Sequence, residues 1–303
     1  MKIAVFGGTG LVGKVLIEYL LKENHEVVCI SRLKQNPTVP TFNIDVSKES
    51  EFENITFTPE IVLNCSSLTP QQNKTSTQPD FVADLFKVNA VGGVNIANWA
   101  VKKNARLVIN YSTLVTVKKP WPVHMSEEYN SIPDGFHTAY CMSKLSQEQL
   151  MTNATITNDI KTIHLRLSAV YGNQMPSNGL IHNFFNQLKI GEDLKLTNGN
   201  KVFLNFIHTD DIARITTQLL KVKIFSGVYN CASSQEISIL ELASNCKSII
   251  NATSKILNID EQSSVSRASI NNDKLKNLLG ENFLYEKYSF KTRLSELAEN
   301  YFQ

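Results

Sequence analysis

The chain has 303 residues, of which 42% are hydrophobic and 19% are charged, and its formal net charge at pH 7 is only +2. This is the composition of a globular protein with an extensive core, and it gives no reason to expect a nucleic acid or a membrane as partner. The 5 cysteines form no CxxC pair, and no metal-ligand spacing involves them or the 6 histidines, so we expect no metal, no disulfide framework and a cytoplasmic location.

Short apolar runs alternate with helical patterns through the first half of the chain. The runs that predict buried strands are residues 3–6, 27–30, 61–63, 107–109 and 162–165. Apolar residues recur on one helical face between residues 11 and 20, and the clearest later helix is expected from about residue 81 to residue 103. This alternation predicts an α/β fold, in which right-handed crossovers arrange the strands into one doubly wound parallel sheet of the Rossmann type.

The pattern changes after Tyr171 and Gly172. A loop rich in Asn, Pro, Ser and Gly leads into a predicted helix at about residues 181–189, followed by strands at 203–208 and 228–230. The remaining chain is richer in helical patterns and more polar. We therefore predict a dinucleotide-binding domain over residues 1–171, to which the chain returns around 203–232, and a smaller mixed α/β substrate-binding domain over residues 172–303.

The strongest local signal is the glycine-rich segment of residues 7–13, between the first predicted strand and the first predicted helix. Gly7, Gly10 and Gly13 recur at intervals of three. Small residues allow the backbone to turn sharply and to approach a pyrophosphate at the helix N-terminus. A tight β–α turn without a ligand is the alternative, but the flanking strand and amphipathic helix favour a dinucleotide cofactor.

The end of the second predicted strand indicates which dinucleotide binds. NAD sites usually carry an acidic residue about 20 residues beyond the glycine loop, whereas this chain has Ser31 and Arg32 there. A guanidinium and a hydroxyl suit a 2′-phosphate, which favours NADP and leaves NAD open. Asp45 and Val46 follow the next strand-like segment and could bracket the adenine; the alternative for Asp45 is a turn or helix N-cap residue.

Tyr140 and Lys144 form the candidate catalytic pair. Their spacing of four in a helical segment puts both side chains on one face, one turn apart. Tyrosine has an ordinary pKa of about 10, and a neighbouring ammonium is expected to lower it. A surface pair is the alternative for so common a spacing. Thr113, or alternatively Ser112, ends the strand before this segment and could polarise a substrate oxygen, unless the two merely close a turn.

These motifs together resemble the short-chain dehydrogenase/reductase superfamily. The residues that occur in its order are the glycine loop, Asn64 to Ser67, Asn89, Ser112 with Thr113, and Tyr140 with Lys144. Three later segments are similar to its extended branch: 165–172 (LRLSAVYG), 206–211 (FIHTDD) and 228–230 (VYN). That branch contains nucleotide-sugar epimerases, dehydratases and reductases. The resemblance spans nearly the whole chain and is specific to the family, but not to a substrate.

The resemblance implies that a hydride passes between C4 of a nicotinamide and a carbon of a sugar. Tyr140 would be the acid/base, Lys144 its pKa-lowering partner and Thr113 the group that holds the substrate oxygen. Asn183 would lie near the nucleotide diphosphate, with a helix-surface amide as its alternative. The residues expected at the cofactor are Gly7, Thr9, Gly10, Leu11, Val12, Gly13, Ser31, Arg32, Asp45, Val46, Cys65, Ser66, Ser67, Asn89, Tyr140, Lys144, Ser168 and Val170.

Three departures from the family pattern bear on the substrate and the reaction. Leu204 and Asn205 stand where many relatives carry an arginine for the substrate diphosphate, and Thr116-Val117 replaces a Val-Tyr pair. Either other residues hold the diphosphate or the substrate is not a nucleotide sugar. Leu114-Val115 follows Thr113 where dehydratases often place an Asp-Glu pair, so dehydration is disfavoured.

The function expected from these residues is that of an NAD(P)-dependent oxidoreductase acting on a nucleotide-activated sugar. Its net reaction would be epimerisation or the reduction of a 4-keto sugar. A reductase of a non-nucleotide carbonyl compound is one alternative. A non-catalytic protein that senses NADP is another, although such relatives usually lack the tyrosine or the lysine. The resemblance also allows a homodimer through the helices that carry Asn89 and Tyr140.

Overall fold

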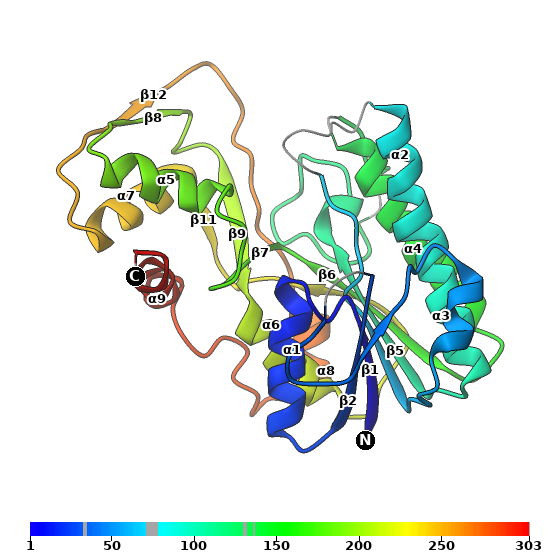
Figure 1. Cartoon of the computed structure of the whole chain (residues 1–303). Coiled ribbons are helices and arrows are strands. Elements are labelled where there is room, and N and C mark those ends of the chain that lie inside the picture. The colour runs from blue at the N-terminus through cyan, green and yellow to red at the C-terminus, as the bar shows by residue number, and fades with distance from the viewer. Residues whose placement is uncertain (33–34, 71–77, 130–131, 136, 303) are drawn as a thin grey trace.

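A parallel sheet of seven strands forms the centre of the computed structural model, which describes residues 1–32, 35–70, 78–129, 132–135 and 137–302 (Figure 1). In sheet order the strands are β10 (Gly227–Cys231), β6 (Lys161–Leu167), β5 (Leu107–Thr113), β4 (Ile61–Asn64), β1 (Lys2–Phe6), β2 (Glu26–Ser31) and β3 (Thr41–Asn43). All neighbouring strands are parallel. The chain thus winds from β1 to one edge through β2 and to the other through β4, which confirms the doubly wound fold.

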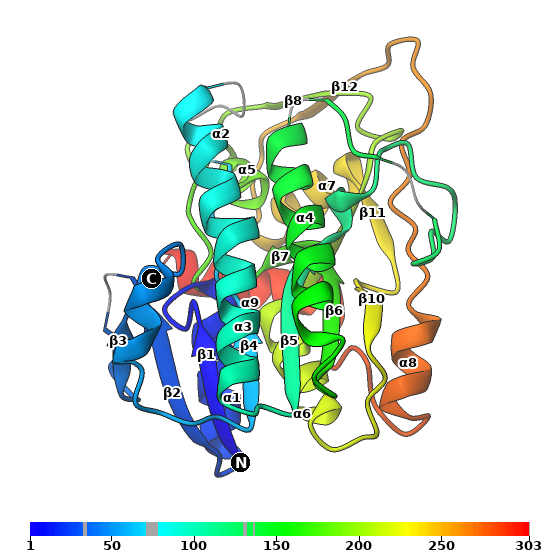
Figure 2. The same cartoon turned by 90° about the vertical axis from the view of Figure 1, so that its right-hand side faces the viewer.

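Helices cover both faces of this sheet (Figures 1 and 2). On one face lie α1 (Leu11–Lys22), α6 (Thr209–Leu219) and α8 (Asp273–Leu279); on the other lie α2 (Pro79–Leu85), the π-helical segment η2 (Phe86–Val91), α3 (Gly92–Lys102) and α4 (Thr138–Thr155). Because successive strand residues face opposite sides, Val5 packs in the same core as Leu16 of α1, whereas Phe6 packs against Trp99 of α3. None of the helices in the described ranges has the length and hydropathy that crossing a bilayer requires.

The rest of the second half builds a smaller part with its own core. Its strands are β7 (Ala169–Tyr171), β9 (Phe203–His208) and β11 (Glu236–Ser238) in one sheet, and β8 (Leu194–Thr197) with β12 (Ile256–Ile259) in another. Its helices are α5 (Leu180–Lys189), α7 (Ile239–Ile249) and α9 (Phe290–Phe302). Phe185, Leu242 and Leu294, one from each helix, meet in one buried cluster. We propose that this part is the predicted smaller domain; the chain rejoins the large sheet with α6 and β10.

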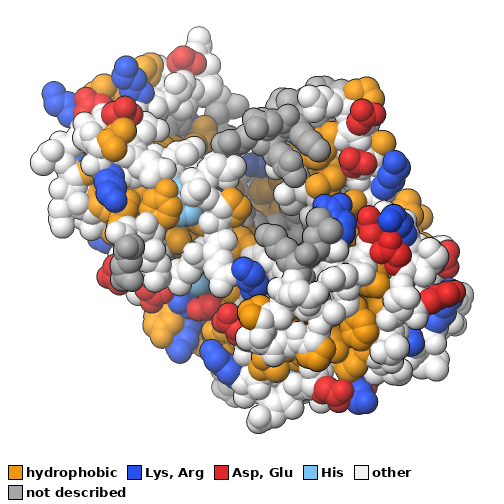
Figure 3. Space-filling model, in the orientation of Figure 1, with side chains coloured by type: hydrophobic (Ala, Val, Ile, Leu, Met, Phe, Trp, Pro, Cys, Tyr) orange, Lys and Arg blue, Asp and Glu red, His pale blue; other side chains and the backbone are white. Residues whose placement is uncertain are grey.

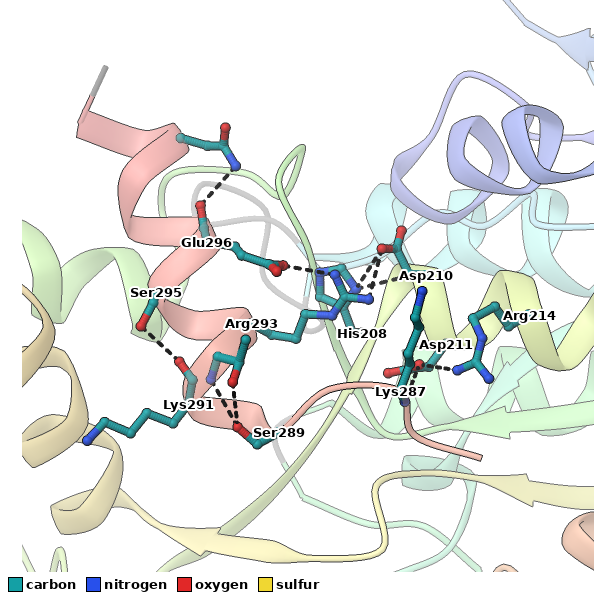
Figure 4. A network of polar contacts seen from close by, with 12 residues as sticks. His208, Asp210, Asp211, Arg214, Lys287, Ser289, Lys291, Arg293, Ser295 and Glu296 are labelled. Carbon is teal, nitrogen blue, oxygen red and sulfur yellow. Dashed lines mark hydrogen bonds and ion pairs between the residues drawn. The ribbon is translucent and has the colours of Figure 1, made fainter. Parts of the chain in front are cut away.

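An ion pair joins the C-terminal helix α9 to the start of α6 (Figure 4). His208 precedes α6, and its Nδ1 accepts a hydrogen bond from the Asp210 backbone N–H at 3.1 Å. Burial and the nearby guanidinium of Arg293 lower the pKa of His208 to about 4, so the ring is neutral and able to accept. Arg293 pairs with Asp210 at 3.0 Å, and Arg214 pairs with Asp211 at 2.9 Å. The His-x-Asp-Asp segment therefore caps α6 and fixes α9.

The two parts leave the surface hollowed between them (Figure 3). One side of the hollow is the part with α5 and α7, and the other carries α2 and α4 (Figures 1 and 3). The carboxyl ends of β1, β4 and β5 point toward it. Two short 3-10 helices, η1 (Glu49–Asn54) and η3 (Leu114–Thr116), follow strands β3 and β5. Open α/β sheets bind ligands beyond the carboxyl ends of their strands, where the strand order reverses. In this sheet that point lies between β1 and β4.

Candidate active site

The glycine loop passes so close to its neighbours that side chains would not fit. Gly7 has φ +72°, and a Cβ there would lie 2.8 Å from the Cys65 carbonyl carbon. A Cβ at Gly13 would lie 2.3 Å from the Gly7 oxygen, whereas one at Gly10 would meet that oxygen at 3.3 Å. Gly10 is the N-cap of α1 and brings no side chain to the first N–H groups of the helix. The loop therefore forms a cradle in which backbone donors can bind a pyrophosphate.

Polar residues also follow β2 and β3, at the same carboxyl edge of the sheet as the glycine loop. Thr9 Oγ1 and Ser31 Oγ are 2.9 Å apart, and Arg32 is exposed just beyond. The Asp45 carboxylate accepts hydrogen bonds from the Ser47 backbone N–H at 3.0 Å and the Ser47 hydroxyl at 2.7 Å. Burial raises the pKa of Asp45, but these hydrogen bonds and the Arg32 charge outweigh it and hold the pKa below its ordinary value. Asp45 thus closes a turn and stays charged beside Arg32.

Several other predicted cofactor residues differ in how accessible they are. Leu11 and Val12 form the partly exposed first turn of α1. Val46 is buried against α3, where a Cβ on Gly92 would lie 2.7 Å from its Cγ2. Burial raises the pKa of the Cys65 thiol far above its ordinary range, so this side chain is neutral. Leu11, Val12 and Cys65 are thus each partly exposed, whereas Val46 is buried.

Asn89 connects the segment after β4 to helix α4. Its Oδ1 accepts from the Leu68 backbone N–H at 2.7 Å, and its Nδ2 donates to the Leu68 carbonyl at 3.0 Å and to Ser143 Oγ at 2.9 Å. The Ser67 hydroxyl donates to the same Oδ1 at 3.3 Å, while the Ser66 backbone N–H donates to Asn64 Oδ1 at 3.1 Å. Asn89 is fully buried. It therefore fixes the segment after β4 to helix α4 next to Tyr140 and Lys144.

Tyr140 and Lys144 lie one turn apart on α4, as predicted. The Tyr140 hydroxyl is hydrogen-bonded to the Ser67 side chain. Lys144 is only 1% exposed, and its Nζ donates to the Tyr111 carbonyl at 2.9 Å and to Gln147 Oε1 at 2.5 Å. Burial lowers the pKa of Lys144 to about 8, although the Glu148 carboxylate raises it in part. Ser67 therefore contacts Tyr140, while Tyr111 and Gln147 hold Lys144.

The expected lowering of the Tyr140 pKa is wrong for this structure. Burial raises the pKa of Tyr140 to about 12, and the hydrogen bond to Ser67 offsets only part of that rise. The Lys144 ammonium is directed at Tyr111 and Gln147, and burial reduces its own tendency to stay charged. Desolvation therefore dominates the pKa of Tyr140, to which Lys144 does not contribute, and Tyr140 is a neutral phenol that can donate a proton.

The structure separates the two candidate hydroxyls at the end of β5. Ser112 is buried, and its Oγ donates to Glu148 Oε1 at 2.5 Å. The Glu148 carboxylate also accepts from Arg166 Nε at 3.0 Å and from Arg166 Nη2 at 2.7 Å. Thr113 is only partly buried, and its Oγ1 accepts a long hydrogen bond of 3.4 Å from the Val115 backbone N–H. The Ser112 hydroxyl thus donates to a buried ion pair. The Thr113 hydroxyl is more available to a ligand.

The residues predicted beyond β6 are spread over a wider region. Ser168 Oγ is buried and, in the part of the chain that is described, has no hydrogen-bond partner. Val170 lies in β7 and is partly buried against the core beside α1 and α6. Asn183 is exposed on α5, where its backbone N–H donates to the Gly179 carbonyl at 2.9 Å. Ser168 is the one of these three whose orphaned hydroxyl itself points to a missing polar partner.

The buried Glu148–Arg166 pair and Gln147 were not singled out in the sequence. Glu148 lies four residues after Lys144, so helical spacing alone places it on the same face. Arg166 lies within the family-like segment 165–172, but its partner comes from another element. Gln147 contacts Asn89, 58 residues away in the chain. The available signal was a run of polar residues on the face of α4 that packs toward the sheet.

Comparisons with known proteins place the chain in one family. The model of a family described as "NAD dependent epimerase/dehydratase family" matches residues 3–232. An ADP-L-glycero-D-manno-heptose-6-epimerase of Brachyspira hyodysenteriae is 29% identical over 122 residues, 38% of each chain. The chain thus spans well under half of that relative. A UDP-N-acetyl-alpha-D-glucosaminuronate decarboxylase of Bacillus cytotoxicus is 21% identical over 84% of this chain and 82% of its own.

Solved structures give the same result for the fold. A UDP-glucose 4-epimerase of Thermotoga maritima, solved with UDP-glucose, has a TM-score of 0.83 and 19% identity, and the match covers 99% of this chain and 98% of that one. The Bordetella bronchiseptica enzyme WbmG, solved with NAD, has a TM-score of 0.83 and 22% identity over 99% and 94% of the two chains. At these identities the likeness concerns the architecture.

Proposed function

The chain belongs to the NAD-dependent epimerase/dehydratase family, and on that premise we propose that it is an NAD(P)-dependent oxidoreductase of nucleotide-activated sugars. The net reaction is epimerisation or the reduction of a 4-keto sugar. The observation that carries the proposal is the placement of Tyr140 and Lys144 one helical turn apart on α4, with Tyr140 beside Ser67 of the segment that follows β4. The retained pair disfavours a protein that only senses the cofactor.

The residues present fit a dinucleotide. The cradle at Gly7 and Gly13 has room for a backbone approach but none for a Cβ, and the buried Ser168 hydroxyl needs a polar partner. The loop and the N-terminus of α1 would bind the pyrophosphate, Lys144 the nicotinamide ribose, and Ser168 the nicotinamide side. When bound, the cofactor supplies or accepts the hydride.

The chain's own residues would manage the proton and the substrate oxygen. In the reducing direction, the neutral Tyr140 phenol donates a proton to the oxygen that becomes the hydroxyl. Thr113 hydrogen-bonds the same oxygen and holds it in place. The Ser67 side chain stabilises the phenolate that remains, because its hydrogen bond favours the charged form. Ser67, already bonded to Tyr140, orients the phenol.

The function is tested by offering the protein a panel of nucleotide sugars and their 4-keto forms with reduced cofactor. Relatives named for UDP-sugars put UDP-linked compounds first. Loss of the reduced-nicotinamide absorbance indicates reduction, whereas a new sugar isomer without that loss indicates epimerisation. If neither occurs with any nucleotide sugar, while a simple carbonyl compound is reduced, the nucleotide-sugar assignment is wrong.

We propose NADP as the preferred cofactor, with NAD also accepted. Arg32 and Ser31 suit a 2′-phosphate, although the family is NAD-dependent and similar structures were solved with NAD. Replacing Arg32 with alanine should weaken NADPH binding by about 10- to 100-fold, the value of a charge-assisted hydrogen bond, and change NADH binding little. Titration of both cofactors checks this, with Arg106→Ala at an exposed site as control. A wild-type preference for NADH would reverse the assignment.

We propose that Thr113, rather than Ser112, holds the substrate oxygen. Thr113→Val keeps the shape of the side chain and should lower kcat by about 10- to 100-fold, the loss of one hydrogen bond to a charged transition state. Ser112→Ala should chiefly lower the free energy of unfolding, by about 1–3 kcal/mol, because Glu148 loses a buried donor. Kinetics and denaturant titrations of both variants check this. The roles are exchanged if Ser112→Ala proves the more damaging to kcat at equal stability.

A further inference from the structure

We propose that Gln147 is a positioning residue that holds the Lys144 ammonium in one orientation and links it to the Asn89 backbone. This inference deepens the proposed function and rests on it for its catalytic meaning. Gln147 is 1% exposed on α4, and neither the family resemblance nor the spacing of the catalytic pair draws attention to it.

The two ends of the Gln147 amide are fixed by partners of opposite kind. Its Nε2 donates to the Asn89 carbonyl at 2.8 Å, and its Oε1 accepts from Lys144 Nζ at 2.5 Å. A carbonyl can only accept and an ammonium can only donate. Rotating the amide by half a turn would place Oε1 against the Asn89 carbonyl oxygen and Nε2 against Lys144 Nζ. The orientation of Gln147 is therefore unique.

These contacts restrict the orientation of the Lys144 ammonium. Lys144 has three N–H donors, and two of them are used by the Tyr111 carbonyl and by Gln147. Tetrahedral geometry then sets the direction of the third, which is the donor left for the ribose or for Tyr140. An acceptor on the ammonium also favours its charged form, which opposes the burial that lowers the pKa of Lys144.

Helix α3 has a glycine at the position where the Gln147 side chain packs against it. A Cβ on Gly93 would lie 2.7 Å from Gln147 Cγ and 3.3 Å from its Nε2. Because glycine leaves this space free, the amide can lie between the two helices and reach Asn89. The contact thus involves a glycine on one helix, a buried amide on the other, and the lysine one turn before it.

The test measures the ionisation of Lys144 directly. Protein labelled with 13C at lysine Cε is titrated by NMR, and the Lys144 signal is identified by its absence in Lys144→Arg. Gln147→Leu removes the acceptor and should lower the titration midpoint of Lys144 by about one pH unit, whereas the isosteric Gln147→Glu should raise it. Gln149→Leu, at an exposed site on the same helix, is the matched control and should leave it unchanged.

Turnover supplies a second readout. In Gln147→Leu the alkaline limb of the kcat profile should move to lower pH by the same amount, because the ammonium is lost earlier. An unchanged Lys144 midpoint in a folded Gln147→Leu protein overturns the inference. If that variant does not fold, an unchanged or lowered midpoint in Gln147→Glu overturns it. Should the midpoints shift as expected while wild-type protein converts no nucleotide sugar, the proposed function fails and the Gln147–Lys144 link stands.

Discussion

Replacing Tyr140 with phenylalanine should lower kcat by about 10³-fold, within the range for loss of a general acid, and should leave cofactor affinity nearly unchanged. The substitution removes only the hydroxyl, which is hydrogen-bonded to Ser67. The aromatic ring stays, so the packing around it should stay as well. Because the pKa of this phenol is raised to about 12, it serves as a neutral acid. Steady-state kinetics and cofactor titration measure the two effects separately.

A second tyrosine provides the control for this experiment. Tyr288→Phe removes a hydroxyl from a 42% exposed residue in the segment before α9, and should change neither kcat nor cofactor affinity. Equal unfolding midpoints for the two variants would show that the loss in Tyr140→Phe is chemical. If Tyr140→Phe keeps wild-type kcat, Tyr140 is not the proton donor, and the enzymatic proposal loses the group on which it rests.

Features set by short stretches of sequence could be predicted before the structure. The strand Ile3 to Phe6, the glycine loop and the helix from Leu11 follow from apolar periodicity and small residues at fixed spacing. The same holds for Tyr140 and Lys144, because a spacing of four on a helix determines that they share a face. These features depend on neighbours within about two turns of chain, and local physics is enough to place them.

Features set by distant partners could not be predicted in the same way. Ser112 and Thr113 are adjacent hydroxyls, and only the position of Glu148, 36 residues further along the chain, separates their environments. The expected lowering of the Tyr140 pKa was wrong because burial, which depends on the whole fold, raises that pKa, while the Lys144 ammonium does not contribute to it. Likewise, the orientation of Gln147 depends on a carbonyl of another helix. Such residues need the packed structure to be recognised.

Replacing Arg166 with methionine should lower the free energy of unfolding by about 3–5 kcal/mol, the cost of leaving a buried charge without its partner. Glu148 is 0% exposed and accepts charge-assisted hydrogen bonds from Arg166 Nε, at 3.0 and 3.3 Å, and from Arg166 Nη2, at 2.7 Å, besides the one from Ser112. Methionine fills similar volume but offers no donor, so among the described residues the carboxylate keeps the Ser112 hydroxyl as its donor and the Lys144 charge nearby. Urea titration of wild type and variant measures the difference.

Two further variants decide whether the unpaired charge is the cause. Lys161→Met lies on the same strand, β6, and breaks a pair with Asp159 whose side chains are 50% and 97% exposed, so it should change the unfolding free energy by less than about 1 kcal/mol. Adding Glu148→Leu to Arg166→Met removes both charges and should restore part of the lost stability. If the double variant is less stable than Arg166→Met alone, the loss comes from packing rather than from a stranded carboxylate. In that case Glu148 and Arg166 do not act as a buried ion pair that determines where Ser112 points.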